Sequence, residues 1–317
     1  MAADDNRQSE ARYLLRRATL RQIEIVEAVA RLGSFTRAAE ELFLTQPTVS
    51  AQVKSLSETV GMPLFEQIGR KIYLTDAGNR VARGCRDVID TLSNLEMSLN
   101  DLKGLKKGRL RLSVITTAKY FAPLAMGDFA KQFPDIEMEL KVSNRDTLLK
   151  RIEDNLSDLY IIGHVPDSGL DLELIPFAPN PLVVIAHRNH PLARERNIPI
   201  ERIAEEPFIM REPGSGIRNK IEEHFAQHGL KLRQRLVLEG PESIKHAVVG
   251  QLGISVVSEH ALNLESEAGP LVKLDVQGFP LQRQWNIVYP RGKVLSVIAR
   301  EFLAFLKEHG GDYLKIG

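Results

Sequence analysis

Apolar residues first follow a regular pattern near residue 20, where they begin to recur every three or four positions. That spacing puts them on one face of an α-helix, and it returns in two more segments before residue 61. Gly33 and Gly61 stand where two of these segments end, and Ser34 and Thr45 can cap the segments that follow, since glycine and hydroxyl side chains favour those positions at helix ends. We therefore predict three helices with tight turns between them, which is the scale of a helix-turn-helix.

Two short apolar segments, 64–67 and 72–74, flank the tight-turn sequence around Gly69. Strand, glycine turn and strand in this order predict a two-stranded β-hairpin. A hairpin directly after three helices completes a winged helix-turn-helix.

A long helix is expected after Thr75, because apolar residues there recur at alternating spacings of four and three. This is a heptad seam, and a stripe so long cannot be buried against one small domain. We predict that it pairs with a second copy of the chain; packing against the chain's own body is the alternative. The seam consists of Val81, Cys85, Val88, Leu92, Leu95, Leu99 and Leu102.

The pattern changes after residue 108 to short β-branched runs separated by helical segments. Residues 136–142 alternate apolar and charged positions, as a strand with one polar face does. Continuous apolar runs, typical of buried strands, follow at 159–162, 182–185, 254–257 and 285–289. This alternation predicts parallel sheets with helices on both faces, arranged as two lobes with a cleft between them.

Composition narrows the class of protein. The chain has 317 residues, of which 43% are hydrophobic and 26% charged, so it is expected to be globular rather than disordered or fibrous. No apolar run approaches the roughly 18 residues of a membrane helix, and the polar residues 1–17 predict a tail rather than a secretory signal. The lone cysteine excludes an internal disulfide and every multi-cysteine zinc pattern, which fits a cytoplasmic protein.

The net charge of +1 argues at first against a nucleic-acid partner, which usually requires a basic surface. Residues 109–317 hold 26 basic and 27 acidic residues, and residues 18–75 hold 6 of each. A reader of DNA built from residues 18–75 would therefore make few phosphate contacts per subunit and depend on groove fit and dimerisation. Its affinity for DNA should fall only gently as salt is raised.

The third helix carries short polar side chains and one cation on the side opposite its apolar stripe. Gln46 suits an adenine edge and Ala51 suits a thymine methyl group, while wing and second-helix cations suit phosphates. An ordinary solvated helix face is the alternative interpretation. The predicted DNA contacts are Arg37, Thr45, Gln46, Pro47, Thr48, Ser50, Ala51, Lys54, Arg70 and Lys71.

Residues 34–78 resemble the DNA-binding domain of LysR-type transcriptional regulators. The matching positions are Ser34-Phe35-Thr36, Ala38-Ala39, Leu44-Thr45-Gln46-Pro47, Val49-Ser50, Gly61, Leu64-Phe65 and Leu74-Thr75. Length and element order extend the resemblance over residues 18–310. Within the family the chain is most similar to regulators of RuBisCO and carbon-fixation operons, on the segments EELFLTQPTVS, FEQIGRKIYLT and REPGSGIR. Residues 1–17 have no counterpart in the family.

The resemblance implies an α/β chain with an N-terminal winged helix-turn-helix, a dimerisation helix and a two-lobed effector domain like a periplasmic binding protein. The implied divisions are a tail at 1–17, the DNA-binding domain at 18–75, the linker helix at 76–107, one lobe at 108–180 with 285–317, and the other at 181–284.

A ligand site is predicted in the cleft. Thr116 and Thr117 end the first strand and lead into a helix, whose N-terminal amides favour anions; the resemblance implies a hydroxyl at this place. Residues 211–218 form a glycine loop that opens a helix between two arginines, although a plain helix cap is the alternative. His164 is better explained as a satisfied core histidine. The predicted ligand contacts are Thr116, Thr117, Arg211, Ser215, Gly216, Arg218 and Ser243.

We therefore predict a sequence-specific regulator that binds promoter DNA as a homodimer or homotetramer, with RNA polymerase as a further partner. Its effector would be a phosphorylated sugar, a nucleotide or a carboxylate, and its targets carbon-fixation genes. No metal or cofactor is expected, and no catalytic motif occurs among those sought. Regulation of a different metabolic operon stays open. A solute-binding protein would leave residues 20–104 unexplained, and an enzyme would need a clustered acid, base or nucleophile.

Overall fold

The computed structural model describes residues 17–69, 71–102, 107–163, 169–263, 265 and 268–314. Arg70 and His164 lie outside the described residues, as do nearly all of the predicted tail and the side chain of Leu102. The chain divides into two compact units, which meet within one long helix between Glu96 and Met97. Within the described residues, no helix is both long and apolar enough to cross a membrane.

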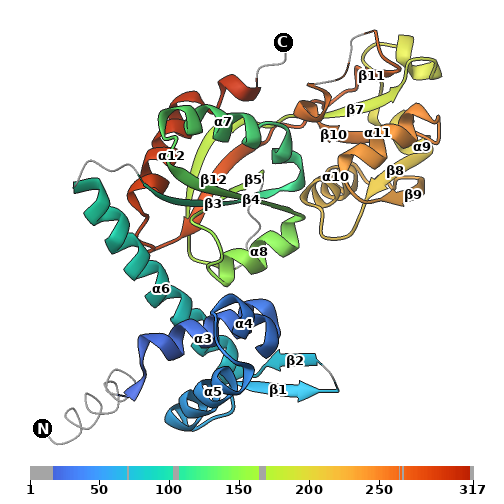
Figure 1. Cartoon of the computed structure of the whole chain (residues 1–317). Coiled ribbons are helices and arrows are strands. Elements are labelled where there is room, and N and C mark those ends of the chain that lie inside the picture. Colours follow the sequence, from blue (N-terminus) through green and yellow to red (C-terminus); the bar gives the residue numbers. More distant parts are fainter. Residues whose placement is uncertain are drawn as a thin grey trace, which may run out of the picture. The chain divides into compact units, whose positions relative to one another are not determined.

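The first unit is the predicted set of three helices and a β-hairpin, followed by a long helix (Figure 1). Thr19, Ser34 and Thr45 cap the three helices, because each hydroxyl accepts a hydrogen bond from the backbone N–H three residues later. Thr75 caps the long helix by accepting from the N–H of Gly78 at 2.9 Å. The elements are α3 (Leu20–Leu32), α4 (Phe35–Glu41), α5 (Gln46–Val60), β1 (Phe65–Ile68), β2 (Lys71–Leu74) and α6 (Asp76–Leu102).

The start of α6 closes the hydrophobic core of the first unit. Cys85 is 5% exposed within that core, and Val81 packs against it. Both were predicted to begin the dimer seam. That prediction is wrong for Cys85, whose side chain is already buried in this core, whereas Val81 is only partly buried and its place in the seam stays a prediction.

The exposed stripe of α6 begins one turn later. Four of its apolar side chains are largely open to solvent within the single chain: Val88, Leu92, Leu95 and Leu99 are 38%, 44%, 56% and 48% exposed. Burying such surface is worth about 25 cal/mol per Å². The stripe is therefore a face that gains stability from a partner.

The second unit begins with a five-stranded sheet of order β4-β3-β5-β12-β6, which forms the first lobe. Helices α7 and α12 cover one face of this sheet and α8 covers the other (Figure 1). Trp285 and Phe121 pack edge to face in its fully buried core. The elements are β3 (Gly108–Ile115), η1 (Thr116–Tyr120), α7 (Ala122–Gln132), β4 (Ile136–Ser143), α8 (Arg145–Glu153), β5 (Leu159–Ile162), β6 (Leu172–Pro179), β12 (Gln284–Pro290), α12 (Val297–His309) and η4 (Asp312–Leu314).

The second lobe holds a three-stranded sheet, β10-β7-β11, and the parallel pair β8-β9. Its apolar residues form two clusters, one on each side of β7. The elements are β7 (Leu182–His187), η2 (Pro191–Arg194), α9 (Ile200–Glu205), β8 (Phe208–Arg211), α10 (Gly216–Gln227), β9 (Gln234–Leu238), α11 (Pro241–Val249), β10 (Ser255–Ser258), η3 (Glu259–Leu262) and β11 (Leu271–Lys273).

The prediction of wholly parallel sheets is wrong. β3 is parallel to β4 and β5, but β12 runs antiparallel to both β5 and β6, and β7 is antiparallel to β10 and β11. The reason for the mixed first sheet is that β6 leads out of the first lobe and β12 leads back into it, so two neighbouring strands run in opposite directions.

The two passages of the chain between the lobes lie side by side. The N–H of Asn180 donates to the carbonyl of Arg283 at 2.7 Å, and Leu182 and Leu281 exchange two hydrogen bonds of 3.0 Å. We call residues 180–182 and 281–283 the lobe crossing. Any change in the angle between the lobes must bend these two short segments.

Candidate functional site

The first candidate site is the exposed face of α5. Val49, Val53 and Leu56 are buried in the core and fix the rotation of the helix. The opposite face therefore points to solvent. Every predicted DNA contact that the structure describes is exposed: Arg37, Thr45, Gln46, Pro47, Thr48, Ser50, Ala51, Lys54 and Lys71.

The N-terminal tip of α5 is held by its own hydroxyl groups. Thr45 accepts from the N–H of Thr48 at 3.4 Å, and the two hydroxyls lie 2.8 Å apart. Thr45 and Thr48 are therefore partly occupied in shaping the tip. Gln46 and Pro47 lie between them, exposed at the end of the helix that would enter a groove.

Sequence reasoning missed an aromatic residue beside this tip. Phe43 lies in the turn between α4 and α5, is 95% exposed and has a φ of 54°. A positive φ is uncommon for a residue other than glycine, and an exposed phenylalanine gains nothing from folding. A large apolar residue in the turn of a helix-turn-helix was the available signal.

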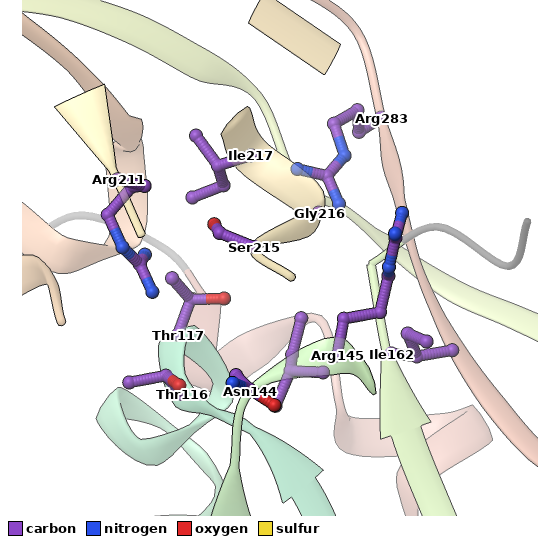
Figure 2. Close-up of a pocket in the computed structure, with 11 residues that line it drawn as sticks. Thr116, Thr117, Asn144, Arg145, Ile162, Arg211, Ser215, Gly216, Ile217 and Arg283 are labelled. Carbon is purple, nitrogen blue, oxygen red and sulfur yellow. The ribbon is translucent and has the colours of Figure 1, made fainter. Parts of the chain in front are cut away.

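The second candidate site is a pocket of about 330 Å³, counting the part open to solvent, in the second unit (Figure 2). It is built where the ends of several strands and the starts of two helices converge. Its lining residues are Ile115, Thr116, Thr117, Asn144, Arg145, Ile162, Arg211, Ser215, Gly216, Ile217 and Arg283.

Five of the seven predicted ligand contacts line this pocket: Thr116, Thr117, Arg211, Ser215 and Gly216. Two do not. Arg218 is held outside the pocket lining, where it donates to Glu222 of α10 at 2.8 Å and to the carbonyl of Arg211 at 3.0 Å. Ser243 is exposed on α11 and is not among the lining residues.

Six lining residues were not predicted: Ile115, Asn144, Arg145, Ile162, Ile217 and Arg283. Asn144 and Arg145 stand at the start of α8, where the Asn144 side chain caps the helix by accepting from Thr147 N–H at 2.9 Å. An asparagine before a helical pattern after a strand was a usable signal. No sequence signal marked Arg283 as a pocket residue, because nothing near it in the sequence belongs to a motif.

Two helix N-termini face the pocket. α8 begins at Arg145 and α10 begins at Gly216, capped by Asn144 and Ser215 respectively. The first N–H groups of a helix have no acceptor inside it and carry partial positive charge. Both helix ends therefore favour an anion in the same space.

Three arginines add formal positive charge, and no acidic residue is among the described residues that line the pocket. Arg211 is compensated from outside, because Nε and Nη2 each donate to a Glu212 oxygen at 2.7 Å. Burial acts to raise the pKa of Glu212, but the hydrogen bonds and charge of Arg211, together with backbone hydrogen bonds, outweigh that effect, and the pKa lies below its ordinary value. This pair is therefore charged at neutral pH.

Arg145 and Arg283 are less well compensated. Arg145 lies 3.4 Å from the half-exposed Asp146. Arg283 is 8% exposed, and its Nε and Nη1 atoms have no hydrogen-bond partner among the described residues. Burial and the neighbouring Arg145 lower the pKa of Arg283 to about 10, still far above neutral pH. The pocket is thus a buried cationic site suited to a small anion.

The described residues contain no group of three or more histidine, cysteine or carboxylate side chains placed to hold a metal ion. Cys85 is also unreactive, because burial first and Glu27 second raise the pKa of its thiol to about 11.

Two known families match the two parts of the chain. Residues 20–79 match the family described as bacterial regulatory helix-turn-helix protein, lysR family, and residues 103–311 match the LysR substrate binding domain. Together the two matches cover most of the chain. The protein belongs to the LysR family of bacterial transcriptional regulators.

Its relatives include regulators of carbon-fixation operons. The transcriptional activator CmpR of Synechocystis sp. is 51% identical over 93% of this chain and 97% of its own. The RuBisCO operon transcriptional regulator of Acidithiobacillus ferrooxidans is 45% identical over 94% of this chain and 96% of its own. The regulatory domain of Synechocystis CcmR, solved in complex with 2-PG, is 47% identical and covers 63% of this chain and 96% of its own with a TM-score of 0.62.

Proposed function

We propose that this protein regulates transcription of carbon-fixation genes by binding promoter DNA through α5 and a small anionic effector in the arginine-lined pocket. The observation that carries the proposal is the pocket itself, with three arginines, two helix N-termini and no acidic residue among its described lining. The pocket also belongs to a chain that matches the LysR family in both its helix-turn-helix and its substrate binding domain. Such a protein would act in the cytoplasm, where the promoter DNA lies.

The exposed face of α5 supports DNA binding. Gln46, Ser50 and Ala51 offer an amide, a hydroxyl and a methyl group, which match the base edges of the major groove. Arg37 and Lys71 are exposed cations suited to phosphates, and Lys54 is only 4.0 Å from Glu58. Few cations are involved, so we expect the affinity for DNA to fall less steeply with salt than it does for a strongly basic DNA-binding protein.

Dimerisation is supported by the exposed stripe of α6. We propose that Val88, Leu92, Leu95 and Leu99 pack against a second copy of the chain, and that two dimers pair on longer promoters. Each dimer would then present two recognition helices to two half-sites, which raises affinity without any new contact to DNA. RNA polymerase is the proposed further partner at the promoter.

One short helix links the pocket to the other lobe and supports coupling between ligand and lobes. η1 carries Thr116 and Thr117 at its start, in the pocket, and Tyr120 at its end. The Tyr120 hydroxyl donates to Glu242 of α11 at 2.5 Å, and Lys119 lies 3.6 Å from the same carboxylate. A ligand that shifts η1 would therefore also shift the contact between the lobes. Coupling of this kind requires different ligand affinities in two states.

The proposed effector is a phosphorylated metabolite. The related regulatory domain of CcmR was solved with 2-PG. Paired arginines and helix N-termini are the groups that hold phosphate and carboxylate oxygens. We define an effector panel of 2-PG, phosphorylated sugars, nicotinamide nucleotides and small carboxylates.

The test is a thermal-shift screen of the full-length protein against the effector panel, followed by footprinting on promoter DNA recovered by selection from genomic fragments. We expect at least one phosphorylated member to raise the unfolding temperature and to change the footprint. If no member does either, the effector half of the proposal fails. If selection enriches no DNA, the DNA-binding half fails.

Two other functions have less support. A regulator of a different metabolic operon would bind the same panel but enrich other promoters. Catalysis is not proposed, because the charged side chains lining the pocket are arginines, which stay protonated and cannot exchange protons as general acids or bases near neutral pH.

A further inference from the structure

Arg283 differs from the other charged residues of the pocket because none of the described residues gives it a compensating charge. It is 8% exposed, and two of its three guanidinium nitrogens have no hydrogen-bond partner among the described residues. Arg211, in the same pocket and also buried, is held by two hydrogen bonds from its guanidinium to Glu212. Burying a charge without a partner is among the most costly arrangements in a protein interior.

A like charge stands beside it. A Cβ atom added to Gly216 would lie 3.3 Å from Cδ of Arg145 and 4.0 Å from Nη2 of Arg283, so both side chains approach the first residue of α10. Figure 2 shows Arg145 and Arg283 on one side of Gly216 and Arg211 on the other. Two cations and a positive helix end thus face the same small volume.

The position of Arg283 ties this charge to the lobe crossing. Its carbonyl accepts from Asn180 N–H at 2.7 Å, and a Cβ on Gly163 would lie 2.5 Å from its Nη2. The backbone is therefore held by one passage of the chain, and the side chain is confined by Gly163, the residue that follows β5. The guanidinium has little room to turn away from Arg145.

We propose that Arg283 is a charge sensor at the lobe crossing: its uncompensated guanidinium beside Arg145 makes the pocket select doubly charged anions over singly charged ones, and it destabilises the ligand-free protein. The inference rests on the proposed function, since it requires an anion in this pocket. Arg283, which lacks a partner among the described residues, and Arg145, which has only the half-exposed Asp146 at 3.4 Å, are neutralised together by two negative charges at one end of a ligand. A single negative charge leaves one cation buried and unpaired.

This proposal predicts that replacing Arg283 does not lower the unfolding temperature of the ligand-free protein, which is unusual for a buried arginine. Most buried arginines stabilise a fold through their hydrogen bonds, so replacing them lowers the unfolding temperature. Here the neutral Arg283→Gln variant should unfold at the same temperature as the unchanged protein or up to about 4 °C higher without ligand. The same variant should lose the thermal shift that a doubly charged anion produces.

The experiment uses the full-length protein at pH 8 with two probes of similar size. Methyl phosphate carries about two negative charges there, because the second pKa of a phosphate ester is about 6, whereas dimethyl phosphate carries one. We expect the unchanged protein to bind methyl phosphate at least tenfold more tightly than dimethyl phosphate by calorimetric titration. Arg283→Gln should bring the two affinities within about threefold of each other.

Arg291→Gln is the matched control. Arg283 and Arg291 stand directly before and after β12, but Arg291 is exposed and pairs with Asp171 at 2.7 Å and Glu173 at 3.0 Å. Its replacement should leave the preference for methyl phosphate intact. Arg145→Gln, which removes the neighbouring charge instead, should also weaken that preference and keeps the test decisive if Arg283→Gln folds poorly.

Three outcomes overturn the proposal: Arg283→Gln keeps the tenfold preference, Arg283→Gln unfolds several degrees lower without ligand, or the unchanged protein binds both probes equally. If the unchanged protein instead binds neither these probes nor any member of the effector panel, the proposed anion site itself fails. The two failures are therefore distinguishable.

Discussion

The proposed DNA-reading face, which consists of α5 with Arg37 of α4 and Lys71 of β2, and the effector pocket both carry positive charge, but in opposite surroundings. Arg37 and Lys71 lie in solvent, where water screens their charge. Arg211 and Arg283 are 4% and 8% exposed, where a charge interacts far more strongly with any partner or like charge. The proposed reading face therefore carries its charge at little cost before DNA binds, whereas we expect the buried charge of the pocket to be balanced only when an anion binds.

The same contrast governs how the two regions are assembled. The reading face comes from one continuous stretch, Ser34 to Leu74, in which caps, glycines and an apolar stripe fix each element locally. The pocket collects residues from six separate places between Ile115 and Arg283. Mutations should therefore act on one region without the other, and the predictions that follow test this from the largest expected effect to the smallest.

The largest effect should come from a charge on the exposed stripe of α6. Leu95→Glu places a carboxylate at a position that is 56% exposed in the single chain and is proposed to be buried in the dimer. Because an unpaired buried charge is strongly unfavourable, we expect the dimer to dissociate at least 100-fold more readily in sedimentation velocity. Val294→Glu, at a position 73% exposed, is the control and should leave the dimer intact. If Leu95→Glu still forms the dimer as the unchanged protein does, the exposed stripe of α6 is not the dimer interface.

A negative charge on the reading face should weaken DNA binding without changing effector binding. Ala51→Glu sets a carboxylate where a methyl group meets the groove, against phosphates of the same sign. We expect affinity for the selected promoter fragment to fall about 100-fold, or about 2.7 kcal/mol, in fluorescence anisotropy. Binding of the effector panel should be unchanged, and equal losses of DNA and effector binding would mean that the variant is misfolded.

A smaller effect should follow when the pocket is crowded without any change of charge. A Cβ at Gly163 would lie 2.5 Å from Nη2 of Arg283 and 2.7 Å from Nδ2 of Asn180, so Gly163→Ala must displace the guanidinium. We expect about tenfold weaker binding of the active effector, or about 1.4 kcal/mol, by calorimetric titration.

Gly127→Ala is the control for that experiment. Gly127 lies within α7 with nothing near its added Cβ, so alanine there should raise stability by about 1 kcal/mol and leave effector affinity unchanged. Unchanged effector affinity in Gly163→Ala would contradict the position assigned to Arg283.

A modest, pH-dependent effect is expected at the contact between the lobes. Burial acts to raise the pKa of Glu242, but hydrogen bonds from Tyr120 and Lys245 hold it below its ordinary 4.5. A carboxyl whose pKa is lower in the folded state adds stability above pH 4.5, and that contribution is lost as the pH falls through the folded pKa.

Tyr120→Phe removes one of these hydrogen bonds and tests the pH dependence directly. It should cost about 1 kcal/mol at pH 7 in thermal unfolding and less below pH 4. A cost that grows on acidification would show that Glu242 does not depend on Tyr120.

The smallest effect is expected at Cys85, which was predicted in the dimer seam but is buried in the core of the first unit. Cys85→Ala should lower the free energy of unfolding by about 1 kcal/mol and leave the monomer–dimer equilibrium unchanged. Sedimentation velocity checks this against Leu95→Glu. A shifted monomer–dimer equilibrium in Cys85→Ala would mean that Cys85 contributes to the dimer interface.

The sequence was sufficient for the first unit because its signals are local. The caps Ser34 and Thr45, the glycines after α3 and α5, and the apolar stripe of α5 each specify their own element. The heptad pattern could not separate Cys85 from Leu95, because two different partners, the chain's own core and a second copy, require the same spacing.

The pocket was only partly predictable for the opposite reason. Thr117 and Ser215 stand at strand and helix ends that a pattern can locate. Arg283 enters the pocket only because the chain returns beside Asn180, a contact between residues about 100 positions apart that no local signal encodes. Its lack of a partner is a property of the folded interior and could not be inferred from residue type.

The most direct test of the account is fluorescence anisotropy of the selected promoter fragment, titrated with full-length protein in the presence and absence of the active member of the effector panel. We predict that the effector changes DNA affinity or the footprint in the unchanged protein and in Arg291→Gln, and that Arg283→Gln does not respond. Identical affinity and footprint with and without a saturating effector in the unchanged protein, or an equal response in Arg283→Gln, would contradict it.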